Sequence, residues 1–275
     1  MSSSPVRRGS IEVAGAACAW GTWGIFVRES GLAVWTIAPL VFLVMAVACW
    51  PLMHREPAPR WDRTAVLLLL VAGLFDGLNV LTYFAALSRT TIAVAVLTHY
   101  LAPILVALLA PLIERTRVPG AVPAAIAATA GLALVLEPWN PAQRGGDVTI
   151  GAALGAASAV FYAGNVFVSR RLATQLGPAR VVGLHALIAA ALLGPGVILA
   201  GGEVTGRGLG IIVAGAIVPG ALAGWVFVRG LARIGSARAA VLTFCEPLVA
   251  VLVGWLVWRE PLGASALAGA ALIVG

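Results

Sequence analysis

Residues 91–113 read TIAVAVLTHYLAPILVALLAPLI, an apolar stretch without a single Asp, Glu, Lys or Arg. An α-helix rises about 1.5 Å per residue, so a stretch of this length can cross the roughly 30 Å hydrocarbon core of a lipid bilayer. The stretch therefore predicts a membrane-spanning helix, with His99 as its one side chain that titrates near neutral pH.

The whole chain shares this composition. Of its 275 residues 61% are apolar and 11% are charged, and the mean hydropathy is +1.00. Soluble domains carry about 45–50% apolar and roughly 25% charged residues. Ten spans of about 20 residues would use roughly 200 residues and leave about 75 for tails and loops. The composition excludes a soluble enzyme and a nucleic-acid-binding module, although the net charge is +7.

Ten apolar runs bounded by Arg, Pro and Gly follow one another along the chain. They are residues 11–27, 33–53, 64–87, 91–113, 119–136, 150–168, 180–200, 208–228, 235–257 and 262–275. We interpret the first run as a retained helix and not as a signal peptide, because no small-residue cleavage site stands out and nine runs follow. The last run has about 14 residues, so we expect a truncated tenth helix in a chain that continues past Gly275.

The basic residues predict how the chain is oriented. All 18 are Arg, and with a cytoplasmic N-terminus only five of them fall in outside segments. These five are Arg28, Arg89, Arg144, Arg207 and Arg259. Because Arg and Lys accumulate in cytoplasmic loops, we expect both termini in the cytoplasm of a multi-pass protein of the bacterial cytoplasmic (inner) membrane. The three Cys lie inside apolar runs and form no disulfide framework or metal motif, so no metal and no cofactor is expected.

The fourth and ninth runs resemble each other, which indicates a duplication. A shift of 144 positions superimposes Pro103 on Pro247 and Arg89 on Arg233. Each half then holds five helices, and an odd number makes the two copies enter the membrane from opposite faces. The predicted fold is an all-α integral membrane protein with ten transmembrane helices as two inverted five-helix repeats, residues 1–140 and 141–275.

Four segments resemble the EamA type of the drug/metabolite transporter superfamily, and the likeness covers both halves. They are residues 19–24 (AWGTWG), 83–87 (YFAAL), 103–114 (PILVALLAPLIE) and 246–260 (EPLVAVLVGWLVWRE). The two halves differ in the spacing from the proline to the acidic loop residue, which leaves the pairing of Glu114 with Glu260 open. The resemblance implies export of metabolites such as amino acids through a cavity lined mainly by the first, third, fourth, sixth, eighth and ninth helices.

Ionisable side chains inside a span are functional candidates, because an Asp at a helix centre costs at least about 2.5 kcal/mol on insertion scales. Asp76 and Glu246 lie near the middle of the third and ninth runs, and His99 lies a turn outside the middle of the fourth. These three are candidates for binding solute and for proton coupling. His185 lies nearer the cytoplasmic end of the seventh run and is a weaker candidate.

Helical spacing predicts which polar side chains share a face. Asp76, Asn79 and Tyr83 stand at i, i+3 and i+7 on the third helix and are expected to face inward. The alternative is that Asp76 and Asn79 form an interhelical hydrogen-bond pair with a packing role only. On the sixth helix, Tyr162 and Asn165 extend a similar stripe that starts at Ser158.

Aromatic residues and prolines complete the predicted site. The aromatic candidates for solute contact are Trp20, Trp23, Tyr83, Tyr100, Tyr162 and Trp225, although aromatics at helical spacing also serve as lipid contacts or packing. Pro103 and Pro247 are predicted helix kinks, because a mid-helix proline removes a donor and frees the carbonyls of His99 and Thr243. Such carbonyls need a partner or a water-filled cavity at membrane depth.

These patterns favour a secondary transporter that exports small organic metabolites, amino acids or related and aromatic solutes, by alternating access. A passive facilitator without proton coupling is the main alternative. A membrane-embedded protease is disfavoured, because Asp76 is the only Asp well inside a span and such an enzyme needs two. A sensory or partner-binding subunit is disfavoured by the short loops. Expected partners are a small solute and membrane lipid, with no nucleic acid, in a monomer or homodimer.

Overall fold

A computed structural model describes residues 4–141, 145–200 and 204–275, and over these residues the protein is all-helical. An isolated antiparallel bridge between Thr90 and Gly146 is the one β-type pairing in the described part of the chain. The predicted all-α class is thus confirmed. Arg144, which the sequence puts in an outer loop, lies outside the described residues.

Each predicted apolar run falls on one helix or on two or three consecutive ones. The helices are α1 (Pro5–Trp20), α2 (Trp23–Ser30), α3 (Val34–Met53), α4 (Arg63–Arg89), α5 (Ile92–His99), α6 (Ala102–Ile113), α7 (Ala121–Leu136), α8 (Val148–Leu176), α9 (Pro178–Leu193), α10 (Pro195–Ala200), α11 (Gly206–Gly215), the π-helix η2 (Ala216–Leu222), α12 (Ala223–Ile234), α13 (Ser236–Leu242), α14 (Cys245–Trp258) and α15 (Ala264–Val274).

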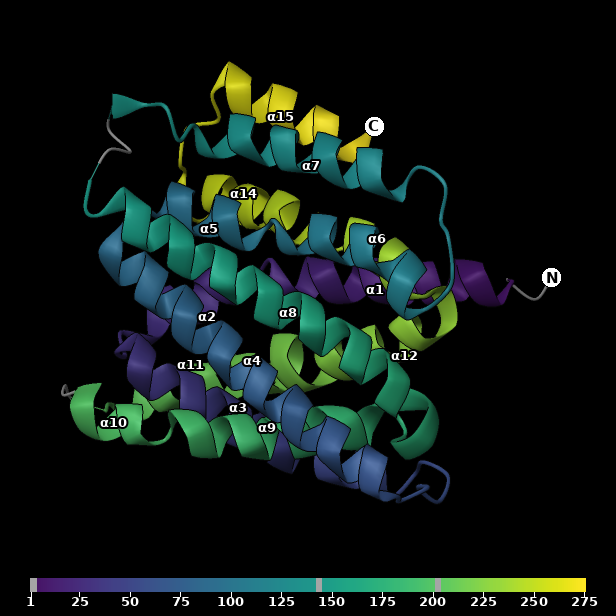
Figure 1. Cartoon of the computed structure of the whole chain (residues 1–275). Coiled ribbons are helices and arrows are strands. Elements are labelled where there is room, and N and C mark those ends of the chain that lie inside the picture. The colour runs from purple at the N-terminus through teal and green to yellow at the C-terminus, as the bar shows by residue number, and fades with distance from the viewer. Residues whose placement is uncertain (1–3, 142–144, 201–203) are drawn as a thin grey trace.

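Within the described ranges, seven helical segments are long and apolar enough to cross a membrane, counting consecutive helices as one segment. They are Pro5–Ser30, Val34–Met53, Arg63–Arg89, Ile92–Ile113, Val148–Leu176, Gly206–Ile234 and Ser236–Trp258. Three further apolar helices, α7, α9 and α15, are shorter. The chain is therefore a multi-pass membrane protein. Figure 1 shows the long helices running side by side, with α15 heading back toward the end of the bundle at which the chain starts.

Three of these segments are interrupted near their middle. The first breaks at Gly21 and Thr22, between α1 and α2. The fourth run, expected to be one kinked helix, breaks after Tyr100, and Pro103 is the second residue of α6. In the ninth run Pro247 is the third residue of α14. Each proline thus lies in the first turn of a new helix, where its missing N–H costs little, and the Thr243 carbonyl accepts the Glu246 N–H at 3.0 Å.

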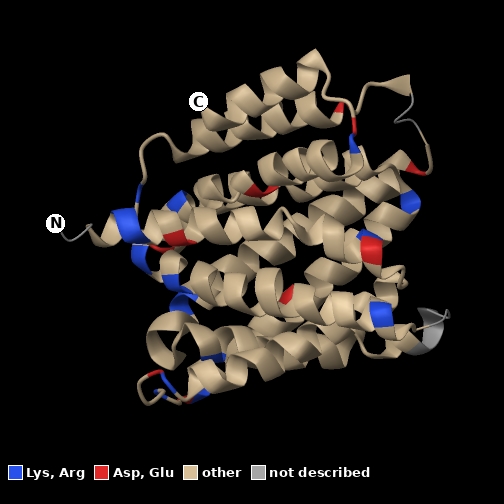
Figure 2. Cartoon of the chain, turned by 180° about the vertical axis from the view of Figure 1, so that it is seen from behind, with Lys and Arg blue, Asp and Glu red and all other residues tan. Residues whose placement is uncertain are grey.

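Helices far apart in sequence pack against each other. The most extensive contacts join α4 to α8, α3 to α9, α1 to α12 and α7 to α15, and in Figure 1 the α7–α15 pair forms one edge of the bundle. Charged residues gather at the two ends of the helices and are sparse between them (Figure 2). At one end Glu56 accepts hydrogen bonds from the backbone N–H groups of Ala179 and Arg180 at the start of α9. The middle of the bundle thus holds mainly apolar and small residues, with few ionisable side chains.

The close approach of α7 and α15 depends on two glycines. A Cβ atom on Gly131 would collide with the carbonyl oxygen of Gly269, and one on Gly269 would collide with that of Gly131. Small residues allow such contacts between membrane helices. We expect Gly131→Leu to lower the stability by about 1–3 kcal/mol, measured as unfolding in detergent. Gly15→Leu is the control, since a Cβ there meets nothing within 4 Å; equal losses in both variants would contradict this packing.

Candidate functional site

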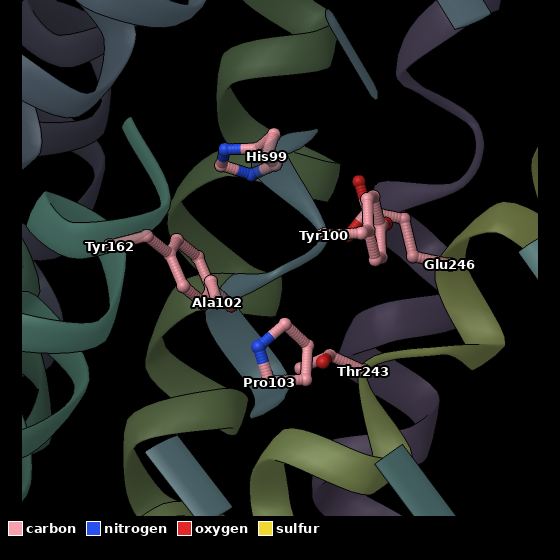
Figure 3. A pocket seen from close by; sticks show the side chains of 7 residues that line it. All are labelled: His99, Tyr100, Ala102, Pro103, Tyr162, Thr243 and Glu246. Carbon is pink, nitrogen blue, oxygen red and sulfur yellow. The ribbon is translucent and has the colours of Figure 1, made fainter. Parts of the chain in front are cut away.

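A small cavity lies where the broken helices meet, between α5 and α6, α8, and α13 and α14. Its lining residues are His99, Tyr100, Ala102, Pro103, Tyr162, Thr243 and Glu246 (Figure 3). Five of these seven are sequence-predicted site or kink residues: His99, Tyr100, Pro103, Tyr162 and Glu246. The cavity volume of about 20 Å³ has room for roughly one water molecule. In this conformation the candidate site is therefore closed around its own side chains.

Aromatic rings surround His99. Its ring centroid lies 4.7 Å from that of Tyr83, 5.6 Å from that of Tyr162 and 5.8 Å from that of Tyr100. Tyr100 in turn packs against Phe244, with 5.6 Å between the ring centroids. The sequence contains three tyrosines, and all three meet here. The predicted inward face of Tyr83 and Tyr162 is thus turned toward the same histidine.

A hydrogen-bond chain orients the His99 imidazole. Nδ1 of His99 lies 2.8 Å from the hydroxyl oxygen of Ser158, and that hydroxyl donates to the Gly155 carbonyl at 2.7 Å. Because the one hydroxyl proton goes to Gly155, Ser158 can only accept from Nδ1–H, which assigns the proton of the neutral ring to Nδ1. Nε2 is then a hydrogen-bond acceptor on a ring that lines the cavity.

Glu246 is held at the first turn of α14, directly after the break. Tyr100 hydrogen-bonds to its carboxylate. Among the described residues Glu246 forms no ion pair with a basic side chain. A Cβ on Gly21 would lie 2.5 Å from the Glu246 carbonyl oxygen, so the break between α1 and α2 fits closely against the start of α14. Only glycine allows this approach of two interrupted helices.

Asp76 is brought close to the cavity but does not line it. Its Oδ2 atom lies 3.1 Å from Nδ1 of His185 on α9, and the two side chains are 18% and 8% exposed. The two atoms are in polar contact, although Nδ1 of His185 forms no aligned hydrogen bond. Sequence reasoning rated His185 a weaker candidate because it lies nearer the cytoplasmic end of its run, and it did not pair His185 with Asp76. Asp76 also lies within electrostatic reach of Tyr162, a residue of the cavity lining.

The other predicted site residues flank the cavity. Trp20 packs against Phe227, Trp23 against Phe26, and Trp225 lies beneath the guanidinium of Arg229, 4.5 Å from the ring centroid. Asn165 accepts the Ser169 hydroxyl within its own helix at 2.6 Å, and Oδ1 of Asn79 is buried without a hydrogen-bond partner. The structure therefore does not bring these predicted residues into the cavity lining.

Sequence reasoning missed Ser158, Thr243 and Phe244 as site residues. Ser158 belongs to the same helical stripe as Tyr162, and Thr243 was noted only for its backbone carbonyl. The sequence signal for all three was their position next to a break or four residues from a tyrosine. Such a position identifies a site residue only when the helix that packs against it is known.

Ion pairs tie the helices together at both ends of the bundle. Near the start of α1, Glu12 contacts Arg229 at 2.9 Å and also Arg233. At the same end Glu114, just after α6, lies 2.5 Å from Arg170 of α8 and accepts the Ser236 hydroxyl. We call the Glu114–Arg170 pair the first latch.

The opposite end carries an equivalent contact. Glu260, just after α14, lies 3.0 Å from Arg28 of α2. We call this pair the second latch. Its side chains are 56% and 58% exposed, whereas Glu114 and Arg170 of the first latch are 7% and 28% exposed. The first latch is thus the more buried of the two.

Comparison with known proteins identifies the family. The profile described as the EamA-like transporter family matches residues 7–136 and again residues 149–275. The chain belongs to this family. A curated relative from Archaeoglobus fulgidus, called an uncharacterized transporter, is 30% identical over 272 residues, which are 98% of this chain and 94% of the relative.

A solved crystal structure shares the fold of this EamA-family chain. It superimposes with a TM-score of 0.83 at 23% sequence identity, over 97% of this chain and 95% of the other. Family and relative together make the chain a membrane transporter of small solutes in a lipid environment, and both carry the names of transporters, not of enzymes. The resemblance inferred from the four sequence segments is thereby confirmed.

The contact between Asp76 and His185 can be tested by a double-mutant cycle. Either single change to Leu leaves its partner buried without a polar contact, whereas the double variant removes both. We expect the double variant to be more stable than the sum of the single losses predicts, by about 1–3 kcal/mol, measured as unfolding in detergent. Asn79→Leu combined with His185→Leu is the control and should be additive. Additivity in both cycles would show that Asp76 and His185 do not interact.

Proposed function

We propose that this protein is an alternating-access exporter of small organic metabolites, amino acids or related and aromatic solutes, across the bacterial cytoplasmic membrane. The observation that carries the proposal is the cavity at the helix breaks. It combines a carboxylate, an imidazole and two tyrosines where an apolar bundle would otherwise be sealed. Irregular backbone at membrane depth is tolerated where it lines a cavity, and transporters bind their solutes at such places.

The helix contacts support ten spans arranged as two inverted repeats. In two such repeats, each of the first five spans corresponds in order to one of the last five. Exchanging the corresponding spans turns the contact of α1 with α12 into the contact of α8 with α4, and both contacts occur. The contact of α5 with α8 becomes that of α13 and α14 with α1, and these also occur. The pairs α3–α9 and α7–α15 map onto themselves, and the fourth span contacts the ninth through α6 and α13. We propose the division into residues 1–140 and 141–275 on this basis.

The same exchange of corresponding spans relates the first latch to the second. The first joins the residue after α6 to α8, and the second joins the residue after α14 to α2, at the opposite end of the bundle. Alternating access requires that the two ends open in turn. We propose that the first latch closes one entrance and the second latch the other.

A solute of drug size occupies about 300–1,000 Å³ in a pocket, far more than the present cavity. Binding must therefore coincide with an opening of one end. Tyr162 connects the cavity with Asp76, and Tyr83 packs on His99, so the opened site would extend toward α4. The flanking Trp20, Trp23, Asn79, Asn165 and Trp225 stay proposed contacts of such an opened site.

Energy coupling has two forms in this proposal. In one, Asp76, His99 or Glu246 takes up a proton that moves against the solute, and in the other the protein is a passive facilitator. A pH gradient across proteoliposomes distinguishes them, since only the coupled form accumulates solute uphill. We further propose that both termini are cytoplasmic, following the distribution of Arg, and that the protein is a monomer or homodimer.

Solute flux tests the proposed site. Proteoliposomes loaded with a metabolite mixture should lose specific solutes, detected by mass spectrometry. We expect Glu246→Ala and Tyr162→Ala to reduce the initial rate at least roughly tenfold, because each removes a group that lines the cavity. Glu29→Ala, an exposed residue paired with Arg207, should keep the wild-type rate. Wild-type flux in both cavity variants, with folded protein recovered, would refute the site.

The latches make a prediction about sidedness. In a chain with Cys18, Cys49 and Cys245 replaced by Ala, Thr243→Cys places a thiol in the cavity lining. Arg170→Gln should raise its labelling by a membrane-impermeant thiol reagent from the face that bears the N-terminus. Arg28→Gln should raise labelling from the opposite face. Labelling that rises equally from both faces in either variant would contradict separate entrances.

A further inference from the structure

The cavity lining holds one acidic side chain and no guanidinium or ammonium group. Glu246 is the one carboxylate and His99 the one imidazole among the seven lining residues, none of the seven is Arg, and the sequence contains no Lys. The neighbouring carboxylate of Asp76 is in contact with His185, whereas Glu246 has no basic partner among the described residues. Glu246 is partly buried. Its ionised carboxylate without a counter-charge is unfavourable there, so the ionised form of the site is complementary to a positively charged group.

Aromatic faces add to this complementarity. Tyr100 and Tyr162 line the cavity, and Tyr83 packs on the His99 ring beside them. Phe244 closes the cluster behind Tyr100. Aromatic rings attract ammonium groups through their quadrupoles, and the attraction is stronger away from water. In Figure 3 the side chains of Tyr100 and Glu246 lie together on one side of the cavity, facing His99 and Tyr162.

The hydrogen-bonding groups favour a donor. Ser158 fixes the His99 proton on Nδ1, so Nε2 accepts, and the Glu246 carboxylate also accepts. The Tyr100 hydroxyl is already used toward Glu246. An ammonium N–H would find acceptors here. A carboxylate on the solute would meet Glu246 and an acceptor nitrogen, with no guanidinium or ammonium group to neutralise it.

We propose that the solutes of this transporter are small organic cations, namely primary and secondary amines, bound with the ammonium group between the Glu246 carboxylate and the tyrosine rings. This inference rests on the proposed function and narrows it. Among the solutes proposed above, it ranks amines ahead of zwitterionic amino acids and anions. Nε2 of His99 then accepts a hydrogen bond from the N–H of the amine, and the rings of Tyr100 and Tyr162 lie against the charged ammonium group.

Three probes with the same aromatic skeleton test the charge preference. They are 2-phenylethylamine, L-phenylalanine and 3-phenylpropionate, supplemented by a panel of aliphatic and aromatic amines of graded size. Binding to the purified protein in detergent is measured by calorimetry. We expect at least one amine to bind roughly tenfold or more tightly than its zwitterionic and anionic counterparts. Equal or tighter binding of a zwitterion or anion, or no binding of any amine, overturns the proposal.

Substitutions in the cavity lining test which side chains cause the preference for amines. Glu246→Gln should weaken amine binding at least roughly tenfold and abolish the preference for amines over the neutral alcohol 2-phenylethanol. Tyr162→Leu removes one ring and should weaken amine binding about fivefold, without a matching loss for the alcohol. Glu29→Gln, at a peripheral carboxylate, is the control and should bind as wild type. A preference that survives in Glu246→Gln overturns the assignment to Glu246.

Failure of this inference is distinguishable from failure of the carrier proposal. Proteoliposomes that move zwitterions or anions, but not amines, leave the transporter standing and refute the charge preference. Amines that bind in calorimetry while no solute crosses the membrane refute transport and keep the cation site. The unfolding temperature of each variant, compared with wild type, shows that lost binding does not reflect lost folding.

Discussion

The bilayer leaves a backbone no water to hydrogen-bond with, so a helix can be interrupted inside it only where other protein groups surround the break. The described part of the chain has three interrupted segments, and two of the breaks, after Tyr100 and after Thr243, border the same cavity. The third, at Gly21, packs on the Glu246 backbone. Because the breaks must be buried together, they place polar groups from several helices in one spot. The site is thus a consequence of how the backbone is satisfied.

Charge is divided between two environments. At the ends of the bundle Arg and Glu form pairs that are partly open to water, and such pairs contribute little to stability singly. In the centre the solvation of a charge is lost, so each ionisable group needs a specific partner. Asp76 has His185, whereas Glu246 has the hydroxyl of Tyr100 and no basic side chain in the described chain. That difference supports different roles for the two central carboxylates: Asp76 joins α4 to α9, and we propose that Glu246 binds solute.

The sequence predicted the helices and much of the cavity lining, but not the partners. Hydropathy locates apolar helices because burial in lipid is a local property of each segment, and every predicted run is helical in the described residues. His99 and Glu246 were found because ionisable groups are costly in a span, and Tyr100 was found as an aromatic candidate. Tyr162 and Asn165 were grouped with them by helical spacing, which defines a face but not its neighbour. The Asp76–His185 contact depends on how α4 crosses α9, and no spacing within either helix contains that angle.

The unequal burial of the two latches bears on how the protein moves. The first latch is largely withdrawn from water and has Ser236 as an additional partner, whereas the second is half exposed. Separating a buried pair leaves uncompensated charges and costs more than separating an exposed one. The conformation described here is therefore held more firmly at the Glu114 end. A ligand shifts such an equilibrium only by its difference in affinity for the two states. A solute that gains a contact with Glu246 only when the Glu114 end opens would supply that difference, and binding in the centre would drive release of the first latch.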